Sequence, residues 1–218
     1  MPNALILGAS RGLGLGLAGE LVKRNWTVWG TVRKPEDGQR LEREGAKPAI
    51  ADITDHDSVG ALRSQVGQLD LLFVNAGISE PAEFDVIDEA GIGHLFMTNA
   101  VAPVRAALTL KDNLAPDGMI AFMSSRMGSV SLTTADNKAM YRASKAALNA
   151  LTRAMLPRFG LDRPVLTFHP GWVATDMGGK GADLDVATSV KGILDVIEQR
   201  RGKAGSCFID YSGAALAW

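Results

Sequence analysis

Short apolar runs typical of β-strands alternate with helix-forming segments along the whole chain. The expected strands are Ala4–Leu7, Thr27–Val32, Lys47–Ala51, Leu69–Val74, Met119–Met123, Pro164–Phe168 and Ser206–Ile209. Several are continuous apolar runs, as expected for strands that are buried on both faces. The segments between them are long enough for crossover helices, for example Leu13–Arg24, Asp57–Val66 and Met140–Phe159. Repeated strand–helix–strand units predict a mainly parallel sheet covered by helices on both faces.

We find no internal repeat, low-complexity tract or linker in the 218 residues. A chain of this length buries a substantial core without disulfides or metals. Residues 1–218 are therefore expected to form a single α/β domain of the Rossmann type, with a doubly wound, seven-stranded sheet.

The composition excludes several classes of function. The net charge is −1 and no basic stripe stands out, which argues against a nucleic-acid partner. Cys207 is the only cysteine, and His56, His94 and His169 share no ligand spacing, so no metal site is expected. The N-terminus lacks the features of a signal peptide, and no stretch approaches the roughly 20 apolar residues of a membrane span. We expect a cytoplasmic protein without a membrane partner.

A glycine-rich turn, Gly8-Ala-Ser-Arg-Gly12-Leu-Gly14, joins the first expected strand to the first expected helix. Glycines let the backbone approach a pyrophosphate closely, and the helix N-terminus supplies free N–H groups. The spacing differs from the general G-x-G-x-x-G fingerprint, and the alternative interpretation is a tight loop without a ligand. The position after the first strand favours dinucleotide binding.

The end of the second strand indicates which dinucleotide is bound. An NAD site usually places a carboxylate there for the ribose hydroxyls. This strand instead ends at Arg33 without a carboxylate, and Glu36 and Asp37 lie beyond Pro35. Arg33 and Arg11 are suited to flank a 2′-phosphate, which favours NADP over NAD. The alternative interpretation is that both are solvated surface arginines.

Tyr141 and Lys145 are four residues apart in a segment rich in helix formers. Residues i and i+4 share one face of a helix, so the phenol and the ammonium are expected to meet. A neighbouring cation lowers a phenol pKa, and such a tyrosine exchanges protons with a carbonyl or an alcohol near neutral pH. An ordinary amphipathic side-chain pair is the alternative.

Together these residues resemble the short-chain dehydrogenase/reductase superfamily, and the resemblance covers nearly the whole chain. The motifs that carry it are, in order, Gly8-x3-Gly12-x-Gly14, Ala51-Asp52-Ile53, Asn75-Ala-Gly77, Asn99, Ser124-Ser125, Tyr141-x3-Lys145 and Pro170-Gly-Trp-Val-Ala-Thr175. Within the superfamily, the chain most resembles one branch, as judged by the long interval between Ser125 and Tyr141 and by the tail ending at Trp218. That branch contains the sniffer carbonyl reductase and the C-factor-like proteins.

The resemblance implies a cofactor site for NADP(H). Asp52 and Ile53 are expected to border the adenine, and Val173 and Thr175 are expected to contact the nicotinamide carboxamide. For the neighbouring Trp172, packing in the core is an equally good interpretation. The full set of expected cofactor-binding residues is Gly8, Ser10, Arg11, Gly12, Leu13, Gly14, Arg33, Asp52, Ile53, Asn75, Ala76, Gly77, Tyr141, Lys145, Pro170, Gly171, Val173 and Thr175. The motifs follow the carboxyl ends of expected strands, where open α/β sheets bind ligands.

The resemblance also implies a catalytic set of Asn99, Ser125, Tyr141 and Lys145. Tyr141 is then the general acid in reduction, and Ser125 binds the substrate oxygen. Lys145 lowers the tyrosine pKa and holds the nicotinamide ribose, and Asn99 anchors a water that relays protons. Hydroxyl donors placed at the substrate oxygen stabilise the negative charge that develops there.

Two features depart from the common family pattern. Tyr141 lies 16 residues after Ser125, which is longer than usual and leaves Ser124 as an alternative catalytic serine. The extra residues fall in Ser131–Lys138, expected to be a loop beside the site. The segment Asp176–Ala182 is brief and leads to a helix near Asp185, so the site is expected to be open or lightly covered.

The favoured function is NADP(H)-dependent reduction of an aldehyde or ketone to an alcohol. One alternative is a non-enzymatic NADP-binding sensor or a C-factor-like signalling protein. Another is an enzyme of a different class on this fold, such as an epimerase or a dehydratase, because fold alone does not determine function. Loops near Ser79–Phe84, Met127–Lys138 and Asp176–Ala182 are expected to shape the substrate pocket. The resemblance further implies a homodimer or homotetramer, assembled through the helices that carry Asn99 and Tyr141.

Overall fold

The structure, a computed structural model, describes residues 1–80, 84–160, 162–179 and 181–218. Two of the loops expected to shape the substrate pocket therefore lie partly outside the described residues, at positions 81–83 and 180.

All the strands form one sheet. The strands are β1 (Asn3–Leu7), β2 (Thr27–Val32), β3 (Lys47–Ile50), β4 (Leu69–Val74), β5 (Leu114–Met123), β6 (Pro164–His169) and β7 (Gly205–Asp210). Their order across the sheet is β3-β2-β1-β4-β5-β6-β7, and every neighbouring pair is parallel. The prediction of a doubly wound parallel sheet of seven strands is confirmed.

Helices connect the strands. They are α1 (Gly12–Lys23), α2 (Pro35–Arg43), α3 (His56–Gln65), α4 (Glu89–Phe96), α5 (Ala102–Leu110), α6 (Ala139–Ala154), α7 (Leu156–Phe159) and α8 (Val186–Arg200). A five-residue π-helical segment, η1 (Met97–Val101), joins α4 to α5, and short 3₁₀ turns form η2 (Lys111–Asn113) and η3 (Arg126–Gly128).

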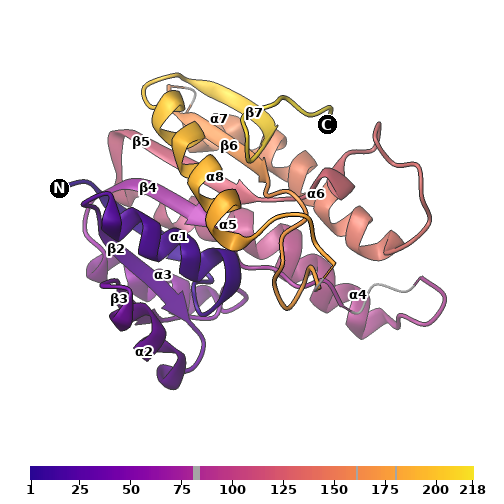
Figure 1. Cartoon of the computed structure of the whole chain (residues 1–218), viewed down its shortest axis with the longest axis horizontal. Helices are drawn as coiled ribbons and strands as arrows, with labels where there is room; N and C mark the ends of the chain where they lie inside the picture. Colours follow the sequence, from indigo (N-terminus) through magenta and orange to yellow (C-terminus); the bar gives the residue numbers. More distant parts are fainter. Residues whose placement is uncertain (81–83, 161, 180) are drawn as a thin grey trace.

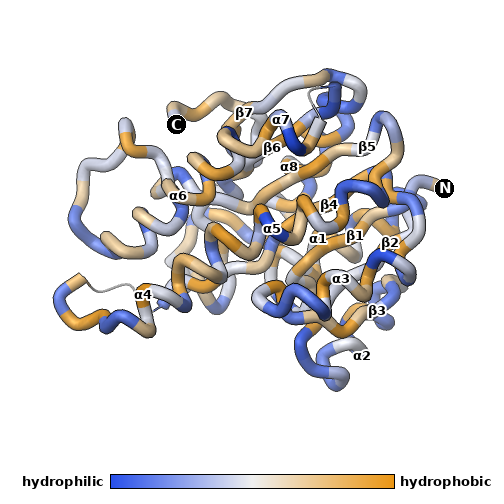
Figure 2. The backbone as a smooth tube through the Cα atoms, turned by 180° about the vertical axis from the view of Figure 1, so that it is seen from behind, coloured by the Kyte–Doolittle hydropathy of each residue, from blue (hydrophilic) through white to orange (hydrophobic). Residues whose placement is uncertain are grey.

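The sheet separates two hydrophobic cores. Side chains of α1, α2 and α8 pack on one face, and those of α3, α5, α6 and α7 pack on the other. Figure 1 shows these helix layers around the sheet, and Figure 2 shows that the strands carry much of the hydrophobic sequence while many connecting turns are hydrophilic. Burial on both faces explains why several of the strands contain continuous apolar runs.

Two element boundaries differ from the expected ones by more than one residue. The expected helix Met140–Phe159 is divided, because α6 ends at Ala154 and α7 begins at Leu156 with Pro157 in its first turn. Proline has no N–H to continue the helical hydrogen bonds and is tolerated mainly in a first turn. Strand β5 begins at Leu114 rather than Met119, with a register shift against β4.

The order of the strands places the ligand-binding edge. The chain passes outward from β1 through β2 to β3, and then returns to β4 on the other side of β1. Such a reversal leaves a crevice at the carboxyl ends of the two strands, where open α/β sheets bind ligands. The segments that follow β4, β5 and β6 project from this edge, on the right-hand side of Figure 1.

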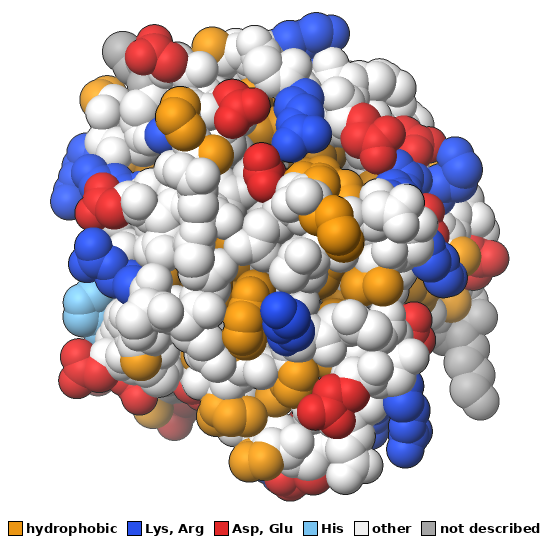
Figure 3. All heavy atoms as spheres, turned by 90° about the vertical axis from the view of Figure 1, so that its left-hand side faces the viewer, with side chains coloured by type: hydrophobic (Ala, Val, Ile, Leu, Met, Phe, Trp, Pro, Cys, Tyr) orange, Lys and Arg blue, Asp and Glu red, His pale blue; other side chains and the backbone are white. Residues whose placement is uncertain are grey.

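The surface carries charges of both signs. Figure 3 shows Lys and Arg interspersed with Asp and Glu over the face beside the N-terminus, without a broad region of one sign. Among the described residues, no helix has the length and apolar character that crossing a membrane requires.

Candidate active site

The glycine turn after β1 is a tightly packed cradle. Gly8 has a φ of 88°, in the region that favours glycine, and its N–H donates to the hydroxyl of Thr31 at 2.8 Å. A Cβ on Gly8 would lie 2.8 Å from Ala76, and a Cβ on Gly14 would overlap the carbonyl oxygen of Gly8. The turn therefore presents bare backbone at the N-terminus of α1, the arrangement that binds a pyrophosphate.

The loop after β4 lies directly against this cradle. Asn75 donates from its side chain to the Gly8 carbonyl at 2.7 Å, and the main-chain N–H groups of Asn75 and Ala76 both donate to Leu7. Gly77 lies close to two expected catalytic residues. A Cβ on Gly77 would be 3.2 Å from Asn99 Oδ1 and 3.3 Å from Lys145 Nζ. These three expected cofactor residues thus connect the cradle to the catalytic set.

Asp52 and Ile53 follow β3 as expected. The Asp52 carboxylate accepts hydrogen bonds from the main chain and the hydroxyl of Thr54, at 2.9 and 2.7 Å. Partial burial acts to raise the pKa of Asp52, but the Thr54 hydrogen bonds and the charge of Arg33 outweigh it and lower the pKa. Asp52 is therefore an anion that shapes its own turn, with Arg33 exposed nearby.

Arg11 and Arg33 lie in different environments. Arg11 forms an ion pair with Asp176 at 2.6 Å, and this pair connects the glycine turn to the segment after β6. Both side chains are largely exposed, so the pair is expected to contribute at most about 1 kcal/mol. Arg40 of α2 donates to the carbonyl of Ser10 at 3.4 Å, which adds a cation beside the turn that sequence reasoning missed.

Lys145 is buried one helical turn after Tyr141. Its Nζ lies 5.9 Å from the centroid of the Tyr141 ring and donates to the carbonyl oxygen of Met123 at 3.0 Å. Burial lowers the pKa of Lys145 to about 8, so the ammonium form still predominates at neutral pH. The expected meeting of the two side chains on one helix face is observed.

The expected lowering of the tyrosine pKa is wrong for this structure. Burial raises the pKa of Tyr141 to about 12, and a hydrogen bond with the side chain of Ser125 opposes this only in part. The Lys145 ammonium is directed to the Met123 carbonyl, and desolvation of the phenol decides the direction of the shift. Tyr141 is therefore in its acid form at neutral pH.

The two adjacent serines have different partners. Ser125 contacts Tyr141, and its hydroxyl oxygen accepts from the N–H of Met127 at 3.1 Å, which makes Ser125 the N-cap of η3. The Ser124 hydroxyl instead donates to Asn149 Oδ1 at 2.7 Å inside the protein.

Asn99 is fully buried in η1. Its Oδ1 accepts from the N–H of Ile78, and its Nδ2 donates to the Ile78 carbonyl, both at 2.8 Å. Nδ2 also donates to the Ser144 hydroxyl at 3.0 Å. The side chain therefore connects the loop after β4 to α6, and π-helical segments of this kind occur frequently at functional sites.

The segment after β6 closes the other side of the site. The Pro170 carbonyl accepts from the Ser189 hydroxyl at 2.6 Å, Gly171 has a φ of 83°, and Val173 is buried beside Leu184. A Cβ on Gly12 would lie 3.5 Å from the methyl carbon of Thr175, so this segment borders the glycine turn.

Trp172 is not a core residue, because 53% of its surface is exposed. Its Nε1–H donates to the carbonyl of Gly178 at 2.8 Å, which fixes the indole against its own loop. Met177 and Val130 are exposed as well, so apolar side chains lie on the segments that follow β5 and β6.

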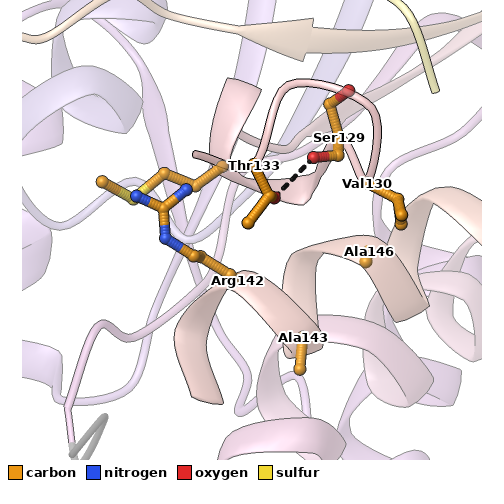
Figure 4. A pocket seen from close by; sticks show the side chains of 7 residues that line it. Ser129, Val130, Thr133, Arg142, Ala143 and Ala146 are labelled. Atoms are coloured by element: carbon orange, nitrogen blue, oxygen red, sulfur yellow. Dashed lines mark hydrogen bonds between the residues drawn. The ribbon is translucent and has the colours of Figure 1, made fainter. Parts of the chain in front are cut away.

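A pocket of about 310 Å³ lies beside η3, between the loop after β5 and α6. Figure 4 shows Arg142, Ala143 and Ala146 on its α6 side, with Ser129, Val130 and Thr133 on its loop side. Its α6 residues occupy a face adjacent to the one that carries Tyr141 and Lys145. The pocket therefore adjoins the expected catalytic set without containing it.

His169, at the end of β6, makes the folded protein sensitive to acid. Its Nδ1 is buried and has no hydrogen-bond partner among the described residues. Burial, aided by the charge of Arg126 and opposed by Asp210, lowers the pKa of His169 from 6.5 to about 4. The unfolded chain therefore binds the proton first, and the stability from neutral His169 is lost as the pH falls from about 6.5 to about 4.

We expect His169→Gln to remove this dependence. Between pH 7 and pH 4.5, the free energy of unfolding of the wild type should fall by about 2–3 kcal/mol more than that of the variant. Urea denaturation at the two pH values measures the difference. His56→Gln, at an exposed histidine of α3, is the matched control and should keep the wild-type dependence. Equal losses in the wild type and His169→Gln would contradict the assignment.

Comparison with known proteins adds independent information. Residues 2–183 match the short chain dehydrogenase family. The C-signal protein of Myxococcus xanthus is 36% identical over 156 residues, which covers 70% of this chain and 94% of that protein. The structure of a carbonyl reductase from Pseudomonas aeruginosa PAO1 in complex with NADP is 39% identical, with a TM-score of 0.92 and all of both chains covered. The carbonyl reductase Sniffer of D. melanogaster is 31% identical, again over all of both chains, with a TM-score of 0.86.

Proposed function

This chain belongs to the short-chain dehydrogenase family, in the branch of the carbonyl reductases and C-signal-like proteins, and we propose that it reduces an aldehyde or ketone with NADPH. Residues 1–218 are proposed to form one cofactor-binding domain. The observation that carries the proposal is the convergence of Ser125, Tyr141, Lys145 and Asn99 beside a glycine cradle, at the ligand-binding edge of the sheet.

In the proposed reaction, NADPH supplies a hydride to the carbonyl carbon when it is bound. Tyr141 donates its phenolic proton to the carbonyl oxygen, so the two additions together give the alcohol. The Ser125 hydroxyl donates a hydrogen bond to the same oxygen and stabilises the charge that develops on it. The Lys145 ammonium provides positive charge beside the phenolate that Tyr141 becomes.

Tyr141 must regain its proton after each turnover. Lys145 is buried beside it, and Asn99 is fully buried, with its Oδ1 and Lys145 Nζ both close to Gly77. We propose that these two residues, with water, return the proton from solvent to Tyr141. The pKa of Lys145, about 8, is suited to exchanging a proton near neutral pH.

We propose Ser125 rather than Ser124 as the catalytic serine. Ser125 contacts Tyr141, whereas the Ser124 hydroxyl is committed to Asn149 at 2.7 Å in the interior. A hydroxyl that breaks a buried hydrogen bond to reach substrate leaves a polar group unsatisfied, which costs about 1–3 kcal/mol.

NADPH is the proposed cofactor because the chain offers both a cradle and cations. Bare glycine backbone at the N-terminus of α1 fits a pyrophosphate, and Arg33 at the end of β2 is an exposed cation suited to a 2′-phosphate. Arg40 donates to the Ser10 carbonyl and so adds a second cation beside the turn. The Pseudomonas aeruginosa relative is described in complex with NADP, which supports the same choice.

Arg33→Ala should weaken the binding of NADPH much more than the binding of NADH. Loss of a guanidinium–phosphate contact is expected to raise the Kd for NADPH about tenfold or more, because charge-assisted hydrogen bonds contribute about 1.5–3 kcal/mol. Titration of each cofactor, followed by fluorescence, measures the two constants. Arg43→Ala, near the end of α2, serves as a control for general loss of positive charge. Equal weakening for both cofactors would exclude the 2′-phosphate role.

The alternative of a signalling protein has support from the similarity to C-signal. The geometry nevertheless favours an enzyme, because binding a cofactor for signalling does not require a buried ammonium beside a buried phenol. Assembly into a homodimer or homotetramer and a cytoplasmic location remain predictions.

The proposed function is tested by NADPH consumption with a panel of aldehydes, quinones and diketones. We expect turnover of at least one class, with formation of the corresponding alcohol or hydroquinone. The product must be identified, because loss of NADPH absorbance alone also reports oxidation without substrate. Tight binding of NADPH with no turnover across the whole panel would favour the signalling alternative.

A further inference from the structure

A third polar residue lies on the α6 face that carries Tyr141 and Lys145. Asn149 follows Lys145 by one helical turn and is almost completely buried. Its Oδ1 accepts from the Ser124 hydroxyl at 2.7 Å, and its Nδ2 donates to the Gly128 carbonyl at 3.1 Å. The side-chain amide of Asn149 therefore forms hydrogen bonds with both ends of the segment from Ser124 to Gly128.

These two points bracket Ser125. Residue 124 lies immediately before it, and residue 128 ends the short turn η3 for which Ser125 is the N-cap. Two more contacts fasten the same segment to α6: Lys145 Nζ donates to the Met123 carbonyl, and a Cβ on Gly128 would lie 2.8–2.9 Å from Lys145. The position of the segment relative to α6 is therefore set chiefly by Lys145 and Asn149.

We propose that Asn149 is a positioning residue that holds the Ser125 hydroxyl against Tyr141, with Ser124 as its partner. The inference rests on the proposed function, since it assigns a role in that reaction. Ser125 comes from β5 and Tyr141 from α6, so the distance between their hydroxyls depends on how the two elements are joined. A displacement of about 1 Å in such a constellation can cost about 100-fold in rate.

The side-chain amide suits this role because it offers an acceptor and a donor at fixed geometry. A carboxylate at position 149 would lack the donor for the Gly128 carbonyl, and an apolar side chain would satisfy neither partner. Either change leaves a buried polar group unpaired, which moves the segment or destabilises it. In either event, Ser125 loses its fixed place beside Tyr141.

The test uses Asn149→Ala and Ser124→Ala, each alone and combined with Ser125→Ala. Alone, Asn149→Ala is expected to lower kcat about tenfold or more and Ser124→Ala by a smaller factor, with the Kd for NADPH within about twofold of wild type. In the Ser125→Ala background neither change should lower kcat further, because both act through Ser125. Independent, multiplied losses in that background would overturn the proposal.

The matched control is Thr152→Val on the same helix. Thr152 is fully buried, and its hydroxyl donates to the carbonyl of Leu148 within α6, away from the Ser125 segment. This isosteric change removes a buried hydrogen bond without altering the contact to Ser125, and kcat should stay within about twofold of wild type. Losses equal to those of Asn149→Ala would reduce the role of Asn149 to general helix stability.

A pH profile of the reverse reaction, alcohol oxidation, separates positioning from damage. The hydrogen bond with Ser125 lowers the pKa of Tyr141, so a displaced Ser125 should raise the apparent pKa of this profile. Partial unfolding reduces the amplitude of the profile and leaves its pKa in place. An unchanged pKa in both Asn149→Ala and Ser124→Ala would contradict the proposal.

The proposal stays testable if Asn149→Ala does not fold. Ser124→Ala removes only one of the two hydrogen bonds and leaves Asn149 bonded to Gly128, so this variant then decides. The wild type and Tyr141→Phe distinguish the proposals: if the wild type turns over no carbonyl, the proposed function fails, and if Tyr141→Phe retains full activity, proton donation by Tyr141 fails. If it is inactive while Ser124→Ala and Asn149→Ala behave like Thr152→Val, only the role of Asn149 is wrong.

Discussion

Tyr141→Phe is expected to lower the kcat of carbonyl reduction by about two to four orders of magnitude, the range typical of a general acid. Burial raises the pKa of Tyr141 to about 12, so the wild-type phenol is protonated at neutral pH and ready to donate. Phenylalanine keeps the ring that packs beside Lys145 but has no proton to give. Steady-state kinetics with NADPH and the best carbonyl substrate measure the loss.

The chain contains one further tyrosine, Tyr211, and Tyr211→Phe is the matched control. It removes a phenolic hydroxyl outside the proposed catalytic set and should leave kcat within about twofold of wild type. Tyr141→Phe should also retain NADPH binding, because the cradle of glycines is untouched. A variant that reduces carbonyls at the wild-type rate would show that another group donates the proton.

Gly14→Ala should have the largest effect on the cofactor site. Its Cβ would overlap the Gly8 carbonyl and lie 2.7 Å from Asn75 Nδ2, so the turn, or the loop after β4, must move. Overpacking of this kind costs about 1–3 kcal/mol in stability. The shifted turn should weaken NADPH binding about tenfold or more, because 1.4 kcal/mol corresponds to a factor of ten. Thermal unfolding and cofactor titration measure the two effects.

Gly60→Ala provides the contrast. Gly60 lies in α3, and no atom is within 4 Å of the position its Cβ would take. Alanine there should stabilise the protein by about 0.5–1 kcal/mol, because glycine is a poor helix former, and should leave NADPH binding unchanged. If Gly14→Ala binds NADPH as tightly as Gly60→Ala does, close backbone approach at Gly14 is not needed.

The sheet was predictable because its strands are buried on both faces. Burial on both sides makes β4 apolar except for Asp70 and gives β2 a high content of valine, tryptophan and threonine, and the expected bounds of both strands match the structure. Strand β5 was predicted too short because its first half contains Pro116, Asp117 and Gly118, which have low strand propensity. The end of α6 could also have been predicted, because Pro157 follows shortly after it in the sequence. The expected helix nevertheless continued through Pro157.

The contacts across the site were beyond sequence reasoning because they join distant segments. The ion pair of Arg11 with Asp176 connects residues 165 positions apart, and the bond between Ser124 and Asn149 depends on how η3 packs on α6. The tyrosine pKa was predicted in the wrong direction for a related reason. Spacing places Lys145 beside Tyr141, but the degree of burial, which dominates the shift, is a property of the whole fold.

The π-helical segment η1 also limits which changes in length the chain tolerates. Each residue advances a helix by about 100°, so a segment with one extra residue per turn rotates α5 relative to α4 by that amount. In the present register, Leu95 of α4 and Leu110 of α5 are both fully buried, and Asn99 faces Ile78. Deleting one residue from Met97–Val101 would give a regular helix, but either Leu95 or Leu110 would leave the core. The irregular turn at Asn99 is therefore needed for packing as well as for placing the site.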